Sequence, residues 1–136
     1  FSVVSVGIDN VNDILQRITS VAGKADVIYT PASNLIQPAI AAVSAAARQI
    51  GVPIVNSDSS AVANGTVPAS FSVDYGKVGL NAGKIAAEIL NGKSPADIPP
   101  SAPTYETHAP MISKSAAAAF GIEIPTSFDD CGCIVE

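Results

Sequence analysis

Residues that usually carry enzyme chemistry are scarce in this sequence. Its 136 residues include no Trp, one His and one Met. The single histidine, His108, lies in a proline-rich stretch and has no recognisable base or nucleophile beside it. A Ser-His-Asp enzyme therefore has little support. We predict that His108 is an ordinary surface residue and that the chain has no catalytic residues.

Charged side chains are scarce as well. They make up 14% of the chain, against about 25% in typical soluble domains, and the formal net charge is −5. Because nucleic-acid phosphates need a surface rich in Lys and Arg, this balance argues against a nucleic-acid partner. Hydrophobic residues make up 48% of the chain. So apolar a chain indicates a sheet buried on both faces, or a surface covered by another body.

The sequence also lacks long apolar runs and a leader. No run reaches the roughly 18 residues that a membrane helix needs, and no charged segment followed by an apolar one comes after Phe1. We therefore expect a processed or excised piece of a longer protein.

Cysteine is limited to Cys131 and Cys133, in the last six residues. Two residues are too few for a disulfide framework or a four-ligand zinc site. We predict that this tail is structurally incidental, with a redox role or an intermolecular disulfide as the alternative.

The hydrophobic pattern predicts strands that alternate with helices. Short β-branched or apolar runs predict strands at residues 2–8, 25–30, 52–57 and 69–73. Apolar residues at helical spacing predict three helices: one begun by Asn12 or Asp13 and ended by Gly23, one from Ser33 or Asn34 to residue 50, and one over 75–91.

Composition changes after the third of these helices. Five of the ten prolines lie between Pro95 and Pro110, which predicts an extended strap over residues 93–112. A short helix over 114–120, begun by Ser113, and a short strand at 122–124 follow.

Alternating strands and helices predict a parallel sheet with right-handed crossovers. Ligands of such sheets bind beyond the carboxyl ends of the strands. These ends supply our candidate ligand-binding residues: Thr30, Ser33, Asn34, Ser57, Asp58, Asp74 and Tyr75.

Three of these candidates have equally good structural interpretations. Asn34 would either bind an anion at a helix start or only cap that helix. Asp58 would contact a ligand, hold a metal or form a turn. Tyr75 would stack on a ligand or pack at the start of a helix.

We predict neither a cofactor nor a metal. A single carboxylate such as Asp58 is weak support for Mg²⁺ or Ca²⁺, which gather several oxygen ligands. The glycines at 76, 79 and 83 match neither the dinucleotide fingerprint nor a P-loop, so we predict that they allow close packing of their helix.

Several short motifs, in order, resemble one family. The resemblance rests on residues 10–13, 23–29, 31–34, 52–54 with 57–59, 64–65, 74–75 with Gly79 and Gly83, 89–99 and 120–125. Taken together, roughly residues 3–126 resemble the second lobe of the ABC-transporter substrate-binding proteins of the tryptophan/tyrosine-binding type. The family usually has an acidic residue where this chain has Ser33, whereas Asn34 matches.

The resemblance implies an α/β fold with three α/β/α layers and a mostly parallel sheet, as one lobe of a two-lobed binding protein that is incomplete at its N-terminus. Residues 1–126 would form the lobe and residues 127–136 a tail. The resemblance implies no enzyme activity. It implies capture of a small-molecule ligand, such as an amino acid, in an interlobe cleft, and delivery to an ABC permease.

The implied location is periplasmic or anchored at the cell surface, with a lipoprotein among the possibilities. The missing first lobe, or a second copy of the chain, would be a further partner. Two alternatives stay open: a ligand-sensing domain of a signalling receptor and, with less support, a flavodoxin-like enzyme.

The family topology also predicts a gap in the sheet. Residues 2–8 and 25–30 would be its second and third strands, and their shared neighbour would lie before Phe1. We expect either that 2–8 pairs directly with 25–30, which sequential order slightly favours, or that another polypeptide fills the gap. A bare edge on 25–30 without a partner chain would contradict both outcomes.

Overall fold

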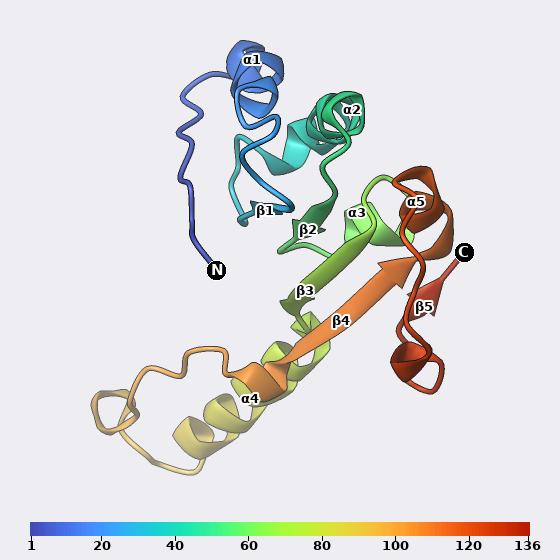
Figure 1. Ribbon diagram of the computed structural model, residues 1–136. Helices are drawn as coiled ribbons and strands as arrows, with labels where there is room; N and C mark the ends of the chain where they lie inside the picture. Colours follow the sequence, from blue (N-terminus) through green and yellow to red (C-terminus); the bar gives the residue numbers. More distant parts are fainter. The chain divides into compact units, whose positions relative to one another are not determined.

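The computed structural model describes all 136 residues and divides into two compact units. Unit 1 comprises residues 1–72 and 110–136, and unit 2 comprises residues 73–109. The chain contains one five-stranded sheet in the order β1-β2-β3-β4-β5 (Figure 1). Its strands are β1 Ile28–Thr30, β2 Ile54–Asn56, β3 Ala69–Val73, β4 His108–Ser113 and β5 Ile134–Val135.

Most of the strand pairs are parallel. β1 pairs with β2, β2 with β3, and β4 with β5 in this sense. β3 and β4 run in opposite directions (Figure 1), and the backbone N–H of Ser113 donates to the carbonyl of Pro68 at 2.9 Å. The predicted α/β class with a mostly parallel sheet is therefore confirmed.

Five α-helices accompany the sheet. They are α1 Ile14–Thr19, α2 Ile40–Ile50, α3 Ser60–Ala63, α4 Tyr75–Leu90 and α5 Lys114–Ala119. None of them is long and apolar enough to cross a membrane. α4 belongs to unit 2, and the other four belong to unit 1.

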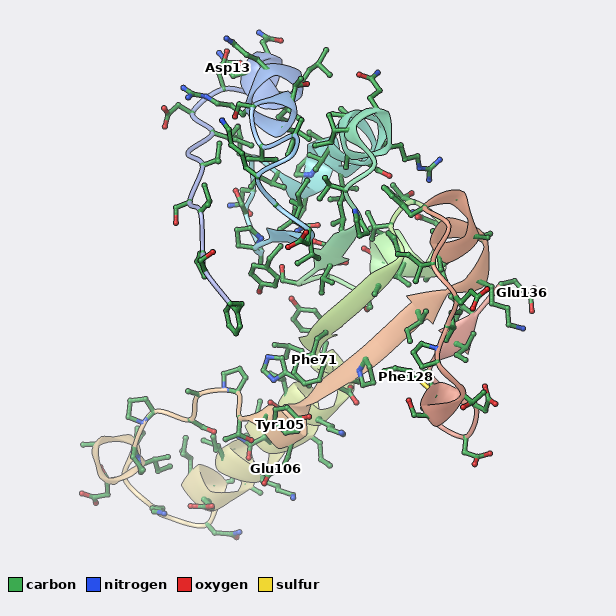
Figure 2. All side chains as sticks on the ribbon, viewed as in Figure 1. Asp13, Phe71, Tyr105, Glu106, Phe128 and Glu136 are labelled. Atoms are coloured by element: carbon green, nitrogen blue, oxygen red, sulfur yellow. A yellow bond between two sulfur atoms is a disulfide. The ribbon has the colours of Figure 1, made fainter.

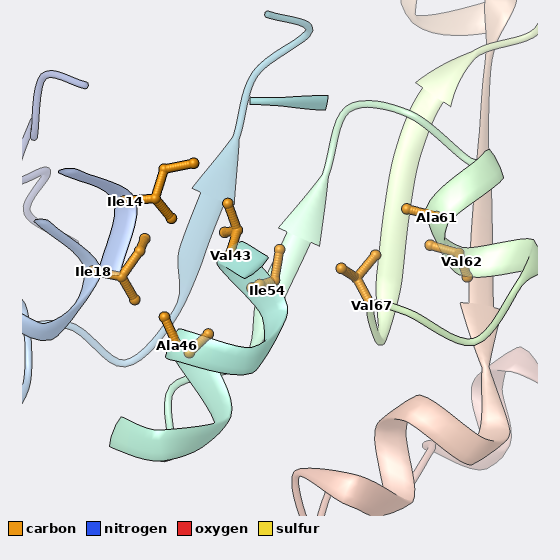
Figure 3. Packing of buried hydrophobic residues seen from close by; sticks show 9 residues of the cluster. Ile14, Ile18, Val43, Ala46, Ile54, Ala61, Val62 and Val67 are labelled. Atoms are coloured by element: carbon orange, nitrogen blue, oxygen red, sulfur yellow. The ribbon is translucent and has the colours of Figure 1, made fainter. Parts of the chain in front are cut away.

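The core of unit 1 joins α1 and α2 to the sheet. Ile14 and Ile18 of α1 point toward Val43 of α2, and Ile54 of β2 completes this contact (Figure 3). Ile14, Val43 and Ile54 are at most 2% exposed. Each such side chain contributes about 1.5–3 kcal/mol by leaving water, so this cluster fixes α1 and α2 on one face of the sheet.

The start of α2 differs from the prediction. The α-helix begins at Ile40, after a 3₁₀ turn over Gln37–Ala39, and not at Ser33 or Asn34. Pro38 has no backbone N–H to give to a regular helix, and the preceding residues form a separate turn. Gly51 ends the helix with φ +70°, as its position after the apolar stripe predicts.

Residues 2–8 form no strand, so the prediction of a strand there is wrong. β1 is the edge of the sheet and pairs only with β2, so the expected direct pairing of 2–8 with β1 is wrong too. The outer edge of β1 is bare in this single chain. β-branched residues favour a strand only where a partner satisfies the backbone. A single chain does not test pairing with another polypeptide, so a partner strand from elsewhere stays a prediction.

The start of the first helix agrees with the prediction only in part. Asp13 stands at the N-cap position of α1, as predicted, but the side-chain cap comes one turn earlier: Asn10 begins the 3₁₀ turn Val11–Asp13, and its Oδ1 accepts from Asn12 N at 2.9 Å. Asp13 makes no capping hydrogen bond.

The C-terminal residues are part of the sheet. β5 pairs with β4, and Ile112 N donates to Cys133 O at 2.9 Å. Cys131 and Cys133 form a disulfide, drawn as a yellow bond in Figure 2. The prediction that the tail is structurally incidental is therefore wrong. The strand expected at 122–124 does not form.

The proline-rich stretch contains a strand that the sequence did not predict. β4 begins at His108, so His108 is a half-buried strand residue and not part of a surface strap. Its Nδ1 lies 2.7 Å from the carbonyl of Thr104. Pro110 tolerates a strand where its missing N–H is not needed for the ladder.

Unit 2 is built around α4. The predicted helix over 75–91 is confirmed, and Asp74 caps it by accepting from Gly76 N at 2.9 Å and Lys77 N at 3.2 Å. No residue of α4 is buried, and the apolar side chains of Leu80 and Leu90 are 63% and 88% exposed. Besides its own backbone and its cap, α4 is held by two exposed hydrogen bonds, from Lys77 Nζ to Glu106 O at 3.1 Å and from Asn81 Nδ2 to Ser101 Oγ at 2.8 Å.

Candidate functional site

Two loops leave the same edge of unit 1 side by side. β1 and β2 are parallel and in register, with Thr30 opposite Asn56, so both strands end together. Ser57 N donates to Thr30 O at 3.0 Å and continues the ladder by one residue. The strand-end residues Thr30 and Ser57 are therefore neighbours, and the two loops that follow begin from one place.

A buried hydrogen-bond network lies beneath this edge. Thr30 is 3% exposed, and its Oγ1 donates to Asn56 Oδ1 at 2.7 Å. Gln37 Nε2 donates to the same Oδ1 at 2.9 Å, and Asn56 Nδ2 donates to Gln37 Oε1 at 3.2 Å. Thr30 thus supports the site from inside the fold, with its hydroxyl already engaged.

Sequence reasoning did not select Asn56 or Gln37. The only signal for Asn56 is an amide side chain that ends an otherwise apolar run, a feature equally typical of an ordinary turn. Gln37 has no sequence signal, because its partner lies 19 residues away.

The loop after β1 is organised by Ser33. Its Oγ accepts from Leu35 N at 3.2 Å and from Ile36 N at 3.4 Å. Gln37 N donates to Ser33 O at 2.9 Å. Asn34 next to it is exposed and stands outside any helix. The prediction that Asn34 begins a helix is therefore wrong, and Ser33 performs the local capping.

Asp58 organises the loop after β2. Its Oδ1 accepts from Ser60 N at 2.8 Å and also from the hydroxyl of Ser60, and its carbonyl accepts from Asn56 Nδ2 at 2.9 Å. The turn-forming role that we considered for Asp58 is thus present in the structure. A carboxylate held by such a turn has a defined position at the edge of the sheet.

Two buried hydroxyls stand near the strand ends. The Oγ atoms of Ser57 and Ser70 are buried and have no hydrogen-bond partner. Ser70 is opposite Asn56 in the β2–β3 register, so its residue belongs to the same row as Thr30 and Asn56. Buried hydroxyls without partners are uncommon in folded proteins.

The remaining candidates belong to unit 2. Asp74 is the cap of α4, and its Oδ2 lies 3.9 Å from Lys77 Nζ. Tyr75 is 75% exposed, so the alternative that Tyr75 packs at the helix start is wrong. The structure thus brings Thr30, Ser33, Asn34, Ser57 and Asp58 to one edge of unit 1.

Groups of three or more His, Cys, Asp or Glu side chains that could hold a metal ion do not occur in the chain. The site is therefore made of hydroxyl, amide and single carboxylate groups. These groups bind small polar molecules through hydrogen bonds.

A sequence model of the family described as ABC transporter substrate binding protein matches residues 1–129. The chain belongs to this family. The family is one of binding proteins, which agrees with the absence of an enzyme motif in the sequence.

Known relatives agree with this assignment. The chain is 40% identical over 99 residues to a tyrosine-binding protein of Clostridioides difficile (strain R20291). The aligned residues make up 73% of this chain and 28% of that protein.

Solved structures show the same fold. One is the ligand-free, open form of a substrate binding protein with adhesive properties from Clostridium difficile: TM-score 0.76, 31% identity, covering 100% of this chain and 44% of that one. Another is an ABC domain from Streptococcus pneumonia in complex with L-Trp: TM-score 0.75, 29% identity, covering 94% of this chain and 43% of that one. A conserved domain protein from Vibrio cholerae has a TM-score of 0.74 at 28% identity, covering 93% and 42% of the two chains. The chain thus spans less than half of these solved proteins and 28% of its curated relative.

Proposed function

We propose that this chain contributes half of an amino-acid-binding site in the solute-binding component of an ABC importer. The ligand is an amino acid or a related compound, held in a cleft between this lobe and a first lobe. The binding component then delivers the ligand to an ABC permease in the membrane. Family membership supports the transport role, and the tyrosine-binding relative and the L-Trp complex support an aromatic amino acid.

The observation that carries the proposal is the pair of loops after β1 and β2. Their polar residues stand at the carboxyl ends of parallel strands, where sheets of this class bind ligands. The loops are also tied together below by the amide of Asn56. A site whose groups are held in place before binding spends less of its binding energy on ordering them.

The individual groups suit the two ends of an amino acid. Asp58 supplies a negatively charged carboxylate for the ammonium group of the ligand. Ser33 has no charge and cannot fill this role. The exposed amide of Asn34 offers hydrogen bonds to the carboxylate of the ligand, and the hydroxyl of Ser57, which is buried and has no partner, stays a predicted contact. Asp74 and the exposed ring of Tyr75 belong to unit 2 and stay predicted ligand contacts of that unit, with Tyr75 as a stacking surface for an apolar side chain.

The proposed partners follow from exposed surfaces. α4 has no buried residue although Leu80 and Leu90 are apolar, and we propose that the first lobe covers it. The backbone of Ile28 and Thr30 bonds to the β2 side. Because successive residues of a strand alternate, the backbone N–H and C=O of Tyr29 face the bare edge of β1. They suit another strand, either from the rest of a longer protein or from a second copy.

We propose a location outside the cytoplasm, periplasmic or anchored at the cell surface. The disulfide between Cys131 and Cys133 supports it, because disulfides persist mainly in oxidising compartments.

Titration of the ¹⁵N-labelled chain with L-tyrosine, L-tryptophan and, as a control, L-alanine tests the proposed function. One lobe provides about half of the contacts, so we expect weak binding, detectable by amide shifts at millimolar ligand and absent as a tight site in calorimetry. Shifts should concentrate in residues 30–35, 57–60 and 74–75. A sub-micromolar affinity would contradict the one-lobe proposal, and shifts confined to other residues would contradict the site.

Asp58→Asn is the decisive variant for ligand chemistry. It keeps an oxygen for the turn to Ser60 but removes the charge, so we expect L-tryptophan binding to weaken about tenfold. Ser20→Ala is the matched control. Its hydroxyl donates to Arg17 O on the exposed end of α1, away from both loops, and its removal should leave the titration unchanged.

A further inference from the structure

We infer that Asn56 and Gln37 are positioning residues that hold the loops after β1 and β2 in one fixed arrangement. This inference deepens the proposed function and rests on it for its ligand. Neither side chain is assigned a ligand contact. Asn56 is fully buried, at 0% exposure, so it acts on a ligand only through the residues that it touches.

The amide of Asn56 uses its whole hydrogen-bonding capacity. An Asn amide has two donors and two acceptor sites. Oδ1 accepts from Thr30 Oγ1 at 2.7 Å and from Gln37 Nε2 at 2.9 Å, while Nδ2 donates to Gln37 Oε1 at 3.2 Å and to Asp58 O at 2.9 Å. A buried network in which every group is satisfied favours a single geometry, because any other arrangement leaves a polar atom unpaired.

Gln37 extends the same network to the other loop. Its Nε2 also donates to the carbonyl of Pro31 at 2.9 Å. The two amides therefore bond to the backbone of both loops, at Pro31 in the first and Asp58 in the second. Backbone contacts fix the path of a loop whatever side chains it carries, so Ser33 and Asp58 receive their positions from residues below them.

Replacing either amide by a side chain of similar size removes hydrogen bonds to the loops. Aspartate at position 56 would place a carboxylate oxygen against Gln37 Oε1 and Asp58 O, where a donor now stands. Methionine at position 37 fills a similar volume but gives no hydrogen bond to Pro31 O. The first change disturbs both loops, and the second disturbs mainly the loop after β1.

Amide hydrogen exchange and ligand titration together test the inference on the full chain. In Asn56→Asp we expect faster exchange of the amides at 57–60 and about tenfold weaker L-tryptophan binding, the equivalent of one buried hydrogen bond. In Gln37→Met we expect faster exchange of the amides at 33–37. The double variant should be no more affected at 57–60 than Asn56→Asp alone, because both residues belong to one network.

Ser44→Ala is the matched control for a purely structural effect. Ser44 is 2% exposed and its hydroxyl donates to Thr66 O at 2.6 Å, a partly buried hydrogen bond of the same unit outside both loops. It should lower the melting temperature while loop exchange and binding stay as in the unmodified chain. Loop exchange that rises equally in Ser44→Ala and Asn56→Asp would overturn the inference.

The outcomes separate the two proposals. If the unmodified chain binds no L-tryptophan, the proposed function fails, and loop exchange still tests the positioning role. If the chain binds L-tryptophan and Asn56→Asp binds it equally well, the positioning role fails alone. Gln37 is only half-buried, so Gln37→Met keeps the test open should Asn56→Asp not fold.

Discussion

Replacing Asp74 will show how unit 2 holds its helix and whether the same carboxylate serves a ligand. Asp74 Oδ1 accepts from two backbone N–H groups at the start of α4, those of Gly76 and Lys77. Asp74→Ala removes these hydrogen bonds together with the charge. Asp74→Asn keeps a capping oxygen and removes only the charge.

The magnitude follows from the local contacts. Loss of an N-cap costs about 1 kcal/mol, and loss of a negative charge at a helix N-terminus about 0.5 kcal/mol. The ion pair with Lys77 is exposed and 3.9 Å long, so it adds little. We expect about 1.5 kcal/mol for Asp74→Ala, roughly a tenfold shift toward fraying, and about 0.5 kcal/mol for Asp74→Asn. No buried residue of α4 compensates for the loss.

Backbone chemical shifts over residues 75–90 measure the helix population in each variant, and Lys77→Ala controls for the ion pair together with the hydrogen bond from Lys77 Nζ to Glu106 O. The expected order of fraying is Asp74→Ala, then Asp74→Asn, then Lys77→Ala. An unchanged α4 in Asp74→Ala would refute the argument that its cap holds it. A loss of L-tryptophan binding in Asp74→Asn with the helix intact would indicate a direct ligand contact.

Two further predictions concern unit 1. Ile54→Ala should reduce the free energy of unfolding by about 3 kcal/mol, because Ile54 is 0% exposed at the centre of the core. Leu15→Ala is the control: Leu15 is 54% exposed, so the change in the free energy of unfolding should stay within about 0.5 kcal/mol. Chemical denaturation measures both variants, and equal losses of stability would contradict the packing. Reduction of the disulfide between Cys131 and Cys133, which are two positions apart, should cost no more than about 2 kcal/mol, because so small a loop restricts the unfolded chain little. Melting curves with and without a reductant measure this, and complete unfolding on reduction would show that β5 depends on the bond.

Local chemistry determined several elements that the sequence predicts well. β3 occupies Ala69–Val73 as predicted, α4 ends one residue before the predicted end, and α5 starts after its cap, where Ser113 Oγ accepts from Ala116 N at 3.2 Å. Caps, helical spacing and terminal glycines act within a few residues. Such signals can be read without knowing what the segment touches.

The edge of the sheet that carries the candidate site was also predictable in outline. The order of strands and helices implies parallel pairing, and parallel strands place their following loops at one edge. Thr30, Ser33, Asn34, Ser57 and Asp58 could therefore be selected as candidates. That Ser33 rather than Asn34 makes the cap, and that Asp58 forms a turn with Ser60, depends on hydrogen bonds that the pattern does not specify.

Only the tertiary structure decided the features that need a distant partner. Residues 2–8 are rich in strand-forming side chains but pair with no strand. In contrast, β4 forms in a proline-rich stretch because β3 supplies backbone partners, and β5 forms in the last residues because β4 does so. The amides of Asn56 and Gln37 lie 19 positions apart and meet only when the fold brings the 3₁₀ turn before α2 to the end of β2. A strand or a buried amide is stable only when groups elsewhere in the chain satisfy its hydrogen bonds, so its place depends on the whole fold.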